Sequence, residues 1–253
     1  MRFVVLGSGA ASAGVAGAPP DLGILPRSLR RGLSTGMKLA IAAAGQAVAQ
    51  ARASGRAAGE LPIVYGSAVG ETETAIELLT SITATRESSP VLFRHSVHNA
   101  AAGLLSIALG SQASSTAVAA GAETLLAVLL EAQGLLSEGT AAVLLVVAEE
   151  GASALLSPGR IAPGGALAWV LAPLAAIAGE EAVGEVYLTA PECRGGGGGE
   201  LPRPAGDPLA PAWQLAAAIA AARAHVDAAP VAVALSAEER WQVRIAGRAE
   251  ALS

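Results

Sequence analysis

The sequence predicts one large α/β domain in which a mostly parallel β-sheet is flanked by helices. Three observations support this fold class. Short apolar runs that are typical of buried strands alternate along the chain with longer segments of helical spacing. One of these runs, Ala142–Val147, is continuously apolar, as expected of a strand buried on both faces. The length of 253 residues also suffices for a well-buried core.

The expected elements follow one another in a regular order. A short strand at Arg2–Leu6 leads into a loop rich in Gly, Ala and Pro at Gly7–Pro26. Helical spacing then runs from Thr35, a candidate N-cap, to about Arg52. Strands that alternate with helices imply right-handed crossovers and parallel pairing. The further elements expected before residue 190 are strands at Ile63–Tyr65, Ser114–Ala119, Ala142–Val147, Ala166–Leu171 and Glu185–Thr189, and helices at Glu71–Arg86, Val97–Leu109 and Ala122–Leu136.

The composition changes sharply after residue 190. Pro191–Pro211 contains five consecutive glycines among five prolines, which predicts a flexible linker. A helix at Ala212–Ala224 and two strands at Val231–Leu235 and Trp241–Ile245 follow. These elements are too few to fold alone, so we expect them to dock on the main domain. The predicted domain, linker and docked tail are residues 1–190, 191–211 and 212–253.

The composition also limits which kinds of binding partner and which cellular compartment are expected. The net charge of -5 argues against a nucleic-acid partner, because neutralising phosphates requires a basic excess. Aromatic residues make up only 3% of the chain, so small side chains must supply a core with close contact between helices and sheet. The single cysteine, Cys193, rules out an internal disulfide and fits a reducing cytoplasm. The apolar run Ala166–Ala178 contains Pro173 and falls short of the ~20 residues of a membrane span, so we expect none.

Two motifs suggest a cofactor or metal, and each has a plainer interpretation. Gly7-Ser8-Gly9 follows a strand, as in a dinucleotide-binding turn, but Ser12 stands where a third glycine is expected. Two histidines three residues apart are weak support for a metal site, and a structural role near a helix start is the better interpretation. We therefore expect no cofactor and no metal. The residues considered for the metal were Glu71, Glu73, His95 and His98.

Three side chains are candidate nucleophiles for an enzyme of other chemistry. Cys193 lies in the Pro/Gly-rich linker, where no helix N-terminus or nearby histidine would activate its thiol. Ser67 and Ser96 lack the nucleophile-elbow pattern. An acyl hydrolase or transferase that uses one of these three residues is the alternative enzymatic hypothesis.

Several spaced motifs together resemble one protein family. In this order they are similar to truncated β-ketoacyl synthase-like proteins of the thiolase superfamily, the chain length factors of the bacterial aryl polyene type. The resemblance covers roughly Arg2–Thr189. It implies a thiolase-like half with a reduced C-terminal remnant. The motifs are Leu25-Pro26 with Arg30-Arg31, Tyr65-Gly66-Ser67, Gly70-Glu71, Ser89-Pro90-Val91-Leu92-Phe93, and Ser96-Val97-His98-Asn99-Ala100-Ala101-Ala102-Gly103.

The same resemblance implies that the chain has no catalytic residue. In active ketosynthases a strand runs into a turn whose cysteine opens a long helix and holds the acyl chain as a thioester. Here Ser115–Ala119 leads to Gly121, which stands at the position of the nucleophile. The His-Thr-x-Gly-Thr motif of the second half is absent, and His225 is the only histidine after Ala190. Loss of a catalytic nucleophile lowers the rate by on the order of 10⁶-fold.

The resemblance further implies a full-length β-ketoacyl-ACP synthase as partner, in a pseudo-symmetric heterodimer that meets the acyl carrier protein indirectly. A module that only docks the carrier or stabilises the partner is an alternative that the sequence does not separate. The arginine cluster is a candidate for docking or else a solvated surface. The expected tunnel or partner-interface residues are Phe93, Asn99, Leu104, Leu105, Leu109, Ser114, Ser115, Thr116, Ala117, Val118 and Ala119, and the arginines are Arg27, Arg30 and Arg31.

Overall fold

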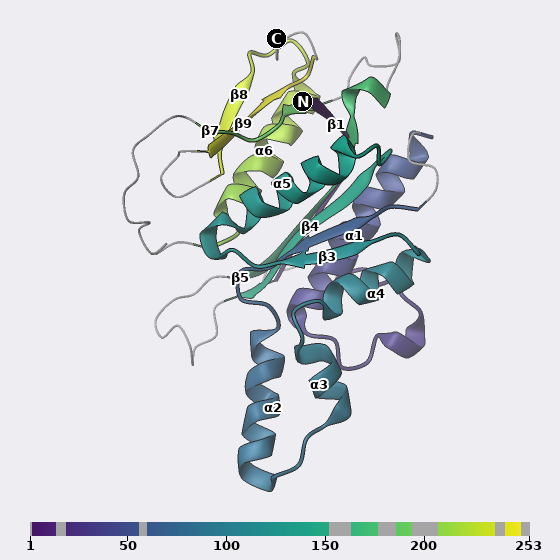
Figure 1. Cartoon of the computed structure of the whole chain (residues 1–253), viewed down its shortest axis with the longest axis vertical. Coiled ribbons are helices and arrows are strands. Elements are labelled where there is room, and N and C mark those ends of the chain that lie inside the picture. The colour runs from purple at the N-terminus through teal and green to yellow at the C-terminus, as the bar shows by residue number, and fades with distance from the viewer. Residues whose placement is uncertain are drawn as a thin grey trace.

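The structure is a computed structural model that describes residues 2–13, 19–55, 60–151, 163–176, 186–193, 207–235 and 241–248, and it has a β-sheet with helices on both faces (Figure 1). The strands are β1 (Arg2–Ser12), β2 (Ile63–Gly66), β3 (Ser115–Val118), β4 (Val143–Gly151), β5 (Pro163–Pro173), β6 (Val186–Thr189), β7 (Glu192–Cys193), β8 (Val231–Ala234) and β9 (Trp241–Ala246). The α-helices are α1 (Thr35–Ala53), α2 (Thr72–Thr85), α3 (Pro90–Ser96), α4 (Ala100–Leu109), α5 (Thr124–Ser137) and α6 (Ala210–Ala224). Short 3-10 helices are η1 (Arg27–Leu29), η2 (Gly121–Glu123) and η3 (Leu174–Ala176).

The sheet is mixed. Its strands lie in the order β3-β2-β4-β5-β1-β6-β9-β7, with β8 on β9. β2 pairs in parallel with β3 and β4, and the other pairs are antiparallel. The α/β class is confirmed, but the expectation of a mostly parallel sheet is wrong for its pairing. β5 pairs antiparallel with both β4 and β1, so it runs opposite to the two strands between which it lies.

Two apolar clusters form the core, one on each face of the sheet. One includes α1 and α4, and the other includes α5 and α6. Alternate residues of β4 belong to the two clusters, which confirms the predicted burial on both faces. None of the helices in the described ranges is long and apolar enough to cross a bilayer. The β4 residues on the α1 side are Leu144, Val146 and Ala148, and those on the α5 side are Val143, Leu145 and Val147.

β1 is longer than the sequence predicts. The expected loop from Gly7 begins instead with strand, because antiparallel pairing with β5 continues to Ser12. Both glycines of the strand face α1. A Cβ on Gly7 would lie 2.0 Å from Ala47 O, and one on Gly9 would lie 2.1 Å from Ala43 O. These glycines let helix and sheet approach closely, as the small-residue composition predicts, and they do not form a dinucleotide-binding turn.

Two helix starts also differ from expectation. The N-cap of α1 is Ser34, whose hydroxyl accepts a hydrogen bond from the first turn, and not Thr35. Between the expected helices Glu71–Arg86 and Val97–Leu109, the chain forms a further helix, α3. Ser89 is its N-cap, and Pro90 occupies the first turn. An N–H group at that position has no acceptor within the helix, so proline loses no hydrogen bond there. The predicted helix Val97–Leu109 therefore reduces to α4, with α3 as a separate element before it.

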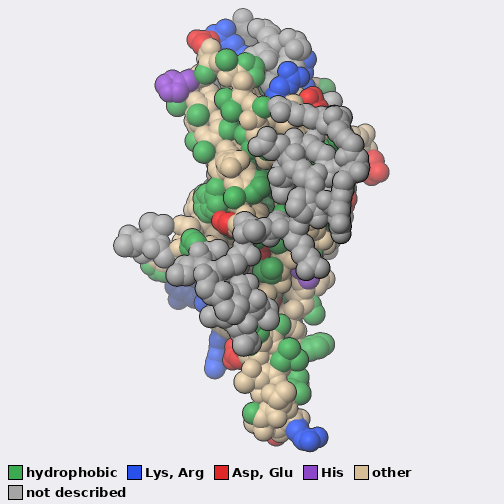
Figure 2. All heavy atoms as spheres, turned by 90° about the vertical axis from the view of Figure 1, so that its left-hand side faces the viewer, with side chains coloured by type: hydrophobic (Ala, Val, Ile, Leu, Met, Phe, Trp, Pro, Cys, Tyr) green, Lys and Arg blue, Asp and Glu red, His purple; other side chains and the backbone are tan. Residues whose placement is uncertain are grey.

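Helices α2 and α3 project from the body as a hairpin, here called the arm (Figure 1). α2 ends at Arg86, which adopts a left-handed conformation with φ 58°. Only Thr74 and Leu78 of α2 are buried, and only His95 of α3. Figure 2 shows hydrophobic side chains on the surface of this projection. The large hydrophobic residues exposed on the arm and its adjoining loops are Val69, Leu79, Ile82, Val91, Phe93 and Val97.

The C-terminal elements pack on the body. β9 continues the sheet beside β6, and Trp213 of α6 lies over Gly165, where a Cβ would come within 2.9 Å of its ring. Arg223 of α6 donates to Ser8 Oγ at 2.7 Å and to Val5 O at 3.3 Å. Residues 194–206 of the expected linker lie outside the described residues, and the division of the chain at 190 and 211 stays a prediction.

Candidate functional site

The loops after β2 and β3 and the end of β4 lie together at the edge of the sheet where these parallel strands end. The loop after β2 runs through Ser67, the loop after β3 runs to Gly121, and β4 ends with Glu149, Glu150 and Gly151. Parallel strands place their carboxyl ends at one edge of a sheet, which is where ligand sites of open α/β folds form. Ser67 N donates to the Val118 carbonyl at 3.1 Å, which joins the first two loops. This edge is the candidate site.

Gly121 forms the corner between β3 and α5. It has φ +57°, is exposed, and leaves open space where a Cβ would stand. Thr124, buried at the start of α5, holds the corner, because its hydroxyl donates to Gly121 O at 2.7 Å and accepts from Ala120 N at 3.1 Å. The chain thus presents only a hydrogen atom at the strand-to-helix corner where the sequence analysis expects the position of the nucleophile.

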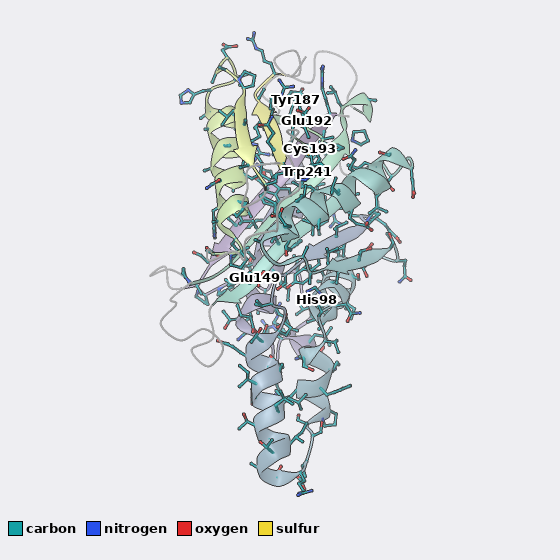
Figure 3. The ribbon with its side chains drawn as sticks, turned by 60° about the vertical axis from the view of Figure 1, so that its left-hand side comes forward. His98, Glu149, Tyr187, Glu192, Cys193 and Trp241 are labelled. Atoms are coloured by element: carbon teal, nitrogen blue, oxygen red, sulfur yellow. The ribbon has the colours of Figure 1, made fainter. Side chains whose placement is uncertain are left out.

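Cys193 lies elsewhere. It is exposed in β7, opposite Trp241 of β9, whereas β3 lies at the other end of the strand order. Figure 3 shows Cys193 beside Glu192 and Trp241, and it shows His98 and Glu149 far from them, where the arm joins the body. The only thiol of the chain is therefore not at the corner.

Neither candidate serine is placed as a nucleophile. Ser67 is buried, and its hydroxyl donates to Glu149 at 3.0 Å and accepts from Gly70 N at 2.8 Å. The Ser96 hydroxyl donates to the Phe93 carbonyl at 2.9 Å. Both hydroxyls are engaged in ordering the chain around the arm.

The two histidines tie the arm to the body. His98 Nε2 lies 2.9 Å from Ser67 O, and its ring meets Tyr65 edge-on with centroids 6.2 Å apart. His95 is buried, with Nδ1 2.8 Å from Gly32 O. The two rings bond different carbonyls, which is the structural role that the sequence analysis preferred to a metal site.

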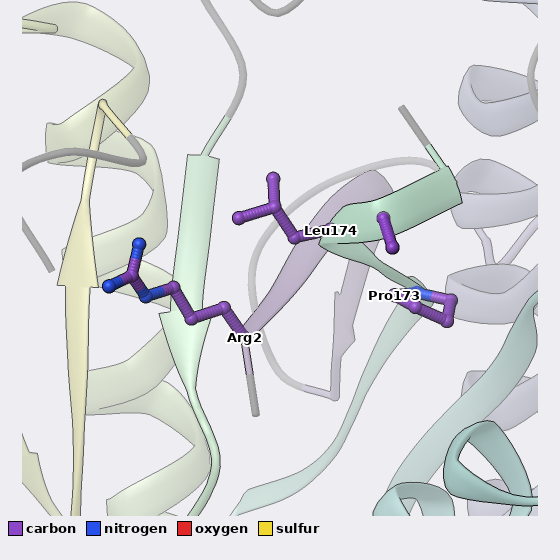
Figure 4. Close-up of a pocket in the computed structure, with 4 residues that line it drawn as sticks. Arg2, Pro173 and Leu174 are labelled. Atoms are coloured by element: carbon purple, nitrogen blue, oxygen red, sulfur yellow. The ribbon is translucent and has the colours of Figure 1, made fainter. Parts of the chain in front are cut away.

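A hollow of about 340 Å³ lies at the base of the arm beside His98. A second hollow, at the start of β1, has Arg2 beside Pro173, Leu174 and an alanine, so it offers one polar side chain (Figure 4). More polar and ionisable side chains line the first hollow than the second. Its lining residues are Val69, Gly70, Glu71, Thr72, Ala75, Ile76, Leu79, Ser96 and His98.

Sequence reasoning missed two buried carboxyl groups at this edge. Glu149 accepts hydrogen bonds from Ser67 Oγ and from the N–H groups of Ala68 and Val69, and burial raises its pKa against the effect of these bonds. Glu150 accepts from the Glu73 N–H at 2.8 Å. The signal in the sequence was two glutamates directly after a continuously apolar strand.

Glu71, from the motif quoted above, joins them. Its carboxyl is buried, and burial together with the neighbouring charge of Glu150 raises its pKa to about 8. Burial likewise raises the pKa of Tyr65, and the charges of the nearby glutamates add to this. The edge thus gathers acidic groups in place of a nucleophile with a base.

The residues expected at the interface divide by exposure. β3 pairs only with β2 among the described strands, so it is an edge of the sheet. Exposed members are Phe93, Asn99, Ser114, Ser115 and Ala119; half-buried members are Thr116, Ala117, Val118 and Leu109; buried members are Leu104 and Leu105. Of the arginine cluster, Arg27 and Arg31 are exposed, and Arg30 donates to the Leu25 and Gly23 carbonyls.

Comparison with known proteins is consistent with this geometry. The chain is similar in structure to a chain of the ketosynthase (ApeO) in complex with its chain length factor (ApeC) from Xenorhabdus doucetiae, with TM-score 0.67 and 21% identity over 97% of this chain and 99% of that chain. It is also similar to the AntDE:AntF complex of a type II PKS acyl-carrier protein with its ketosynthase bound to the hexaketide (TM-score 0.56, 16% identity, 69% of this chain). The ishigamide ketosynthase/chain length factor gives TM-score 0.55 at 18% identity over 69% of this chain.

These likenesses establish the fold. The chain spans almost all of the first matched chain but only 63% and 59% of the other two. No curated protein sequence matches it. The sequence family described as "Beta-ketoacyl synthase, N-terminal domain" matches residues 9–185, which is well over half of the chain. The chain therefore belongs to the family of β-ketoacyl synthase N-terminal domains.

Proposed function

We propose that this chain is a non-catalytic, chain-length-factor-like subunit that pairs with an active β-ketoacyl-ACP synthase and helps to shape its acyl tunnel. The observation that carries the proposal is the missing side chain of Gly121 at the corner between β3 and α5. Condensation requires a thiolate to hold the growing acyl chain as a thioester, and glycine has no atom for this. Cys193 lies at another part of the sheet.

Exposed apolar surface supports the role of a partner. Seven of the nine large hydrophobic side chains that are exposed among the described residues lie between Val69 and Ile107, on the arm and on α4. An apolar concentration of this kind is typical of an interaction surface. Strand β3, at the edge of the sheet, offers unpaired backbone groups beside α4. We propose that β3 and the arm together face the partner.

The comparisons support a heteromer by analogy. A chain that is 99% covered by this one occurs in a complex of a ketosynthase with its chain length factor. The corresponding partner here is a full-length β-ketoacyl-ACP synthase, and the acyl carrier protein would reach the pair indirectly. Arg27 and Arg31, both exposed, are the proposed contacts of the basic cluster, with Arg30 ordering their loop.

Among the expected tunnel residues, Phe93 is the strongest candidate, since it is 60% exposed on the arm. Asn99 lies nearby at the start of α4 and is also exposed. Leu104 and Leu105 are on the buried face of α4, so we propose that they act on the tunnel by positioning this helix. Leu109, half-buried, ends the same helix.

The test is co-expression of this chain with a full-length ketosynthase of the same organism. Native mass spectrometry of the complex, purified through a tag on this chain, should give a one-to-one heteromer. Intact masses after incubation with an acyl carrier substrate should show the acyl adduct on the ketosynthase only. Replacing the cysteine nucleophile of the ketosynthase should abolish product, whereas Gly121→Ala should not.

Three outcomes would contradict the proposal in different ways. A strictly monomeric chain in the presence of its partner would exclude the heteromer. An acyl adduct on Cys193, Ser67 or Ser96 would support a transferase or hydrolase. Substitutions at Phe93 that change the yield but never the product length would support a stabilising module without tunnel control.

A further inference from the structure

Helix α2 begins without a cap of its own. Glu71 stands at its N-cap position, but the side chain makes no hydrogen bond to the N–H groups of the first turn. Such groups need an acceptor, which a side chain at the N-cap commonly supplies. Here the acceptor comes from the body, because Glu150 Oε2 at the end of β4 accepts from Glu73 N at 2.8 Å. The acceptor at the start of α2 is thus a carboxylate that belongs to a strand of the sheet.

The carboxyl groups of Glu71 and Glu150 are neighbours, and each perturbs the pKa of the other. They are only 4% and 6% exposed. The hydroxyl of Ser34, the N-cap of α1, lies beside both carboxyl groups. Glu71 Oε2 and Glu150 Oε1 are both buried, and neither has a hydrogen-bond partner. Two carboxyl groups can form a hydrogen bond only when one of them carries a proton.

Among the residues that the structure describes, the groups around the pair are acidic or neutral. Glu73 faces it from α2, Glu149 from β4 and Tyr65 from β2, and the hydroxyl from α1 is uncharged. His98 bonds the neighbouring loop at Ser67 O rather than the pair. Among the described residues, neither Glu71 nor Glu150 has an ion-pair partner. A second negative charge in the pair would therefore be uncompensated.

The position of the proton follows from the helix. A carboxylate is favoured at a helix N-terminus, which is where Glu150 lies relative to α2. Glu71 is then the protonated partner, which donates to Glu150. Burial, with the charge of Glu150 beside it, raises the pKa of Glu71 to about 8, whereas the unfolded chain has the ordinary value of 4.5.

We infer that Glu71 and Glu150 share a single proton that locks the base of the arm to the body. With the proton in place, Glu71 donates to Glu150, and Glu150 caps α2. When base removes the proton to solvent, two carboxylates face each other in a buried site, and Glu150 can no longer hold its place between Glu71 and the helix. The cap is lost and α2 loosens, while the two-sided core of the body is unaffected.

The direction of the pH effect follows from these groups. In the folded chain Glu71 is protonated below about pH 8, so the lock is closed there and opens at higher pH. Because the loosened arm exposes Glu71, whose carboxyl then has the ordinary pKa of 4.5, each pH unit between 4.5 and about 8 weakens the closed state by about tenfold, and its contribution is gone above about pH 8. The inference concerns the isolated chain and does not depend on the proposed partner.

Hydrogen exchange of the full chain, measured by mass spectrometry between pH 6.5 and 9 and corrected for the intrinsic exchange rate, tests the lock. Protection of the amides of α2 should fall at least about tenfold from pH 6.5 to pH 8 and level off above pH 8, and that of α1 should stay constant. Glu71→Gln retains a donor to Glu150 but cannot titrate, so its α2 should stay protected at pH 9. Glu77→Gln, which changes an exposed carboxyl of the same helix, should behave as the wild type.

Two results would overturn the inference: protection of α2 that does not change with pH in the wild type, or a loss at high pH that persists in Glu71→Gln. Should that variant fail to fold, ¹³C titration of the glutamate carboxyl groups in the wild type decides. One carboxyl that titrates near pH 8 supports the shared proton, and titration of every glutamate below pH 6 excludes it. Neither measurement involves a ketosynthase, so failure here would leave the proposed function standing.

Discussion

The body and the arm of this chain are held together by different forces. The sheet of the body is covered on both faces, and alternate residues of β4 belong to two separate apolar clusters. In the arm, α2 buries only Thr74 and Leu78, and its large apolar residues Leu79 and Ile82 are exposed among the described residues. Apolar packing is therefore sufficient to hold the body together. The arm depends on hydrogen bonds at its base and, we propose, on a partner along its length.

The largest expected effect is in the body. Gly7→Ala would place a methyl group 2.0 Å from the Ala47 carbonyl oxygen and 2.9 Å from Ala51 N, so α1 must move off the sheet. We expect a loss of about 3 kcal/mol in the free energy of unfolding, measured by urea denaturation. Gly103→Ala in α4 is the matched control, since nothing lies within 4 Å of its Cβ, and it should stabilise by up to about 1 kcal/mol. Equal effects of both changes would refute the close contact.

At the base of the arm, the effect should depend on pH. The folded chain binds the Glu71 proton more tightly than the unfolded chain, so the stability that it contributes is complete below pH 4.5 and is lost as the pH rises through about 8. Relative to Glu71→Gln, the wild type should lose about 2 kcal/mol between pH 6.5 and 8, given about 1.4 kcal/mol for each pH unit in this range. Parallel unfolding curves for the two proteins at every pH would contradict this.

The contrast between body and arm also explains which features the sequence could predict. The apolar runs of β2, β4 and β5 and the helical spacing of α1 are local patterns, and they were sufficient for the α/β class. Gly7 and Gly9 were interpreted as loop because glycine usually interrupts a strand, whereas here they admit a helix that packs from a distant part of the chain. Strand direction escaped the sequence because it depends on how β4 connects to β5.

The candidate site was predictable at one residue and not at its neighbours. Gly121 follows directly from a strand-turn-helix pattern, and it lies at that corner. The contact of Glu150 with Glu73 joins residues 77 positions apart, and local spacing holds no signal for it. Helix α3 was missed for a similar reason: Ser89 and Pro90 indicate a helix start as well as a break, and only the tertiary structure decides between them.

A smaller effect is expected where the C-terminal elements meet the body. Arg223 of α6 donates to Ser8 Oγ, to Gln50 Oε1 at 3.2 Å and to Val5 O. Arg223→Ala should lower the free energy of unfolding by about 1–2 kcal/mol, because the bonds are charge-assisted and half-buried. Arg248→Ala is the control, since its ion pair with Asp227 is exposed and should contribute less than about 0.5 kcal/mol. A similar loss from both would mean that α6 is held by its apolar face alone.

The smallest effect on stability, and the sharpest on function, is expected on the arm. Phe93 is 60% exposed, so Phe93→Ala removes little buried surface and should change the free energy of unfolding by less than about 0.5 kcal/mol. If the arm faces a ketosynthase, the same change should weaken the heteromer at least tenfold, since a buried aromatic anchor contributes about 2 kcal/mol or more to an interface. Titration of the tagged ketosynthase by calorimetry measures this, with Ser88→Ala at the exposed tip of the arm as the control. A stable monomer that keeps full affinity without Phe93 would move the interface off the arm and leave the edge strand β3 as its remaining candidate.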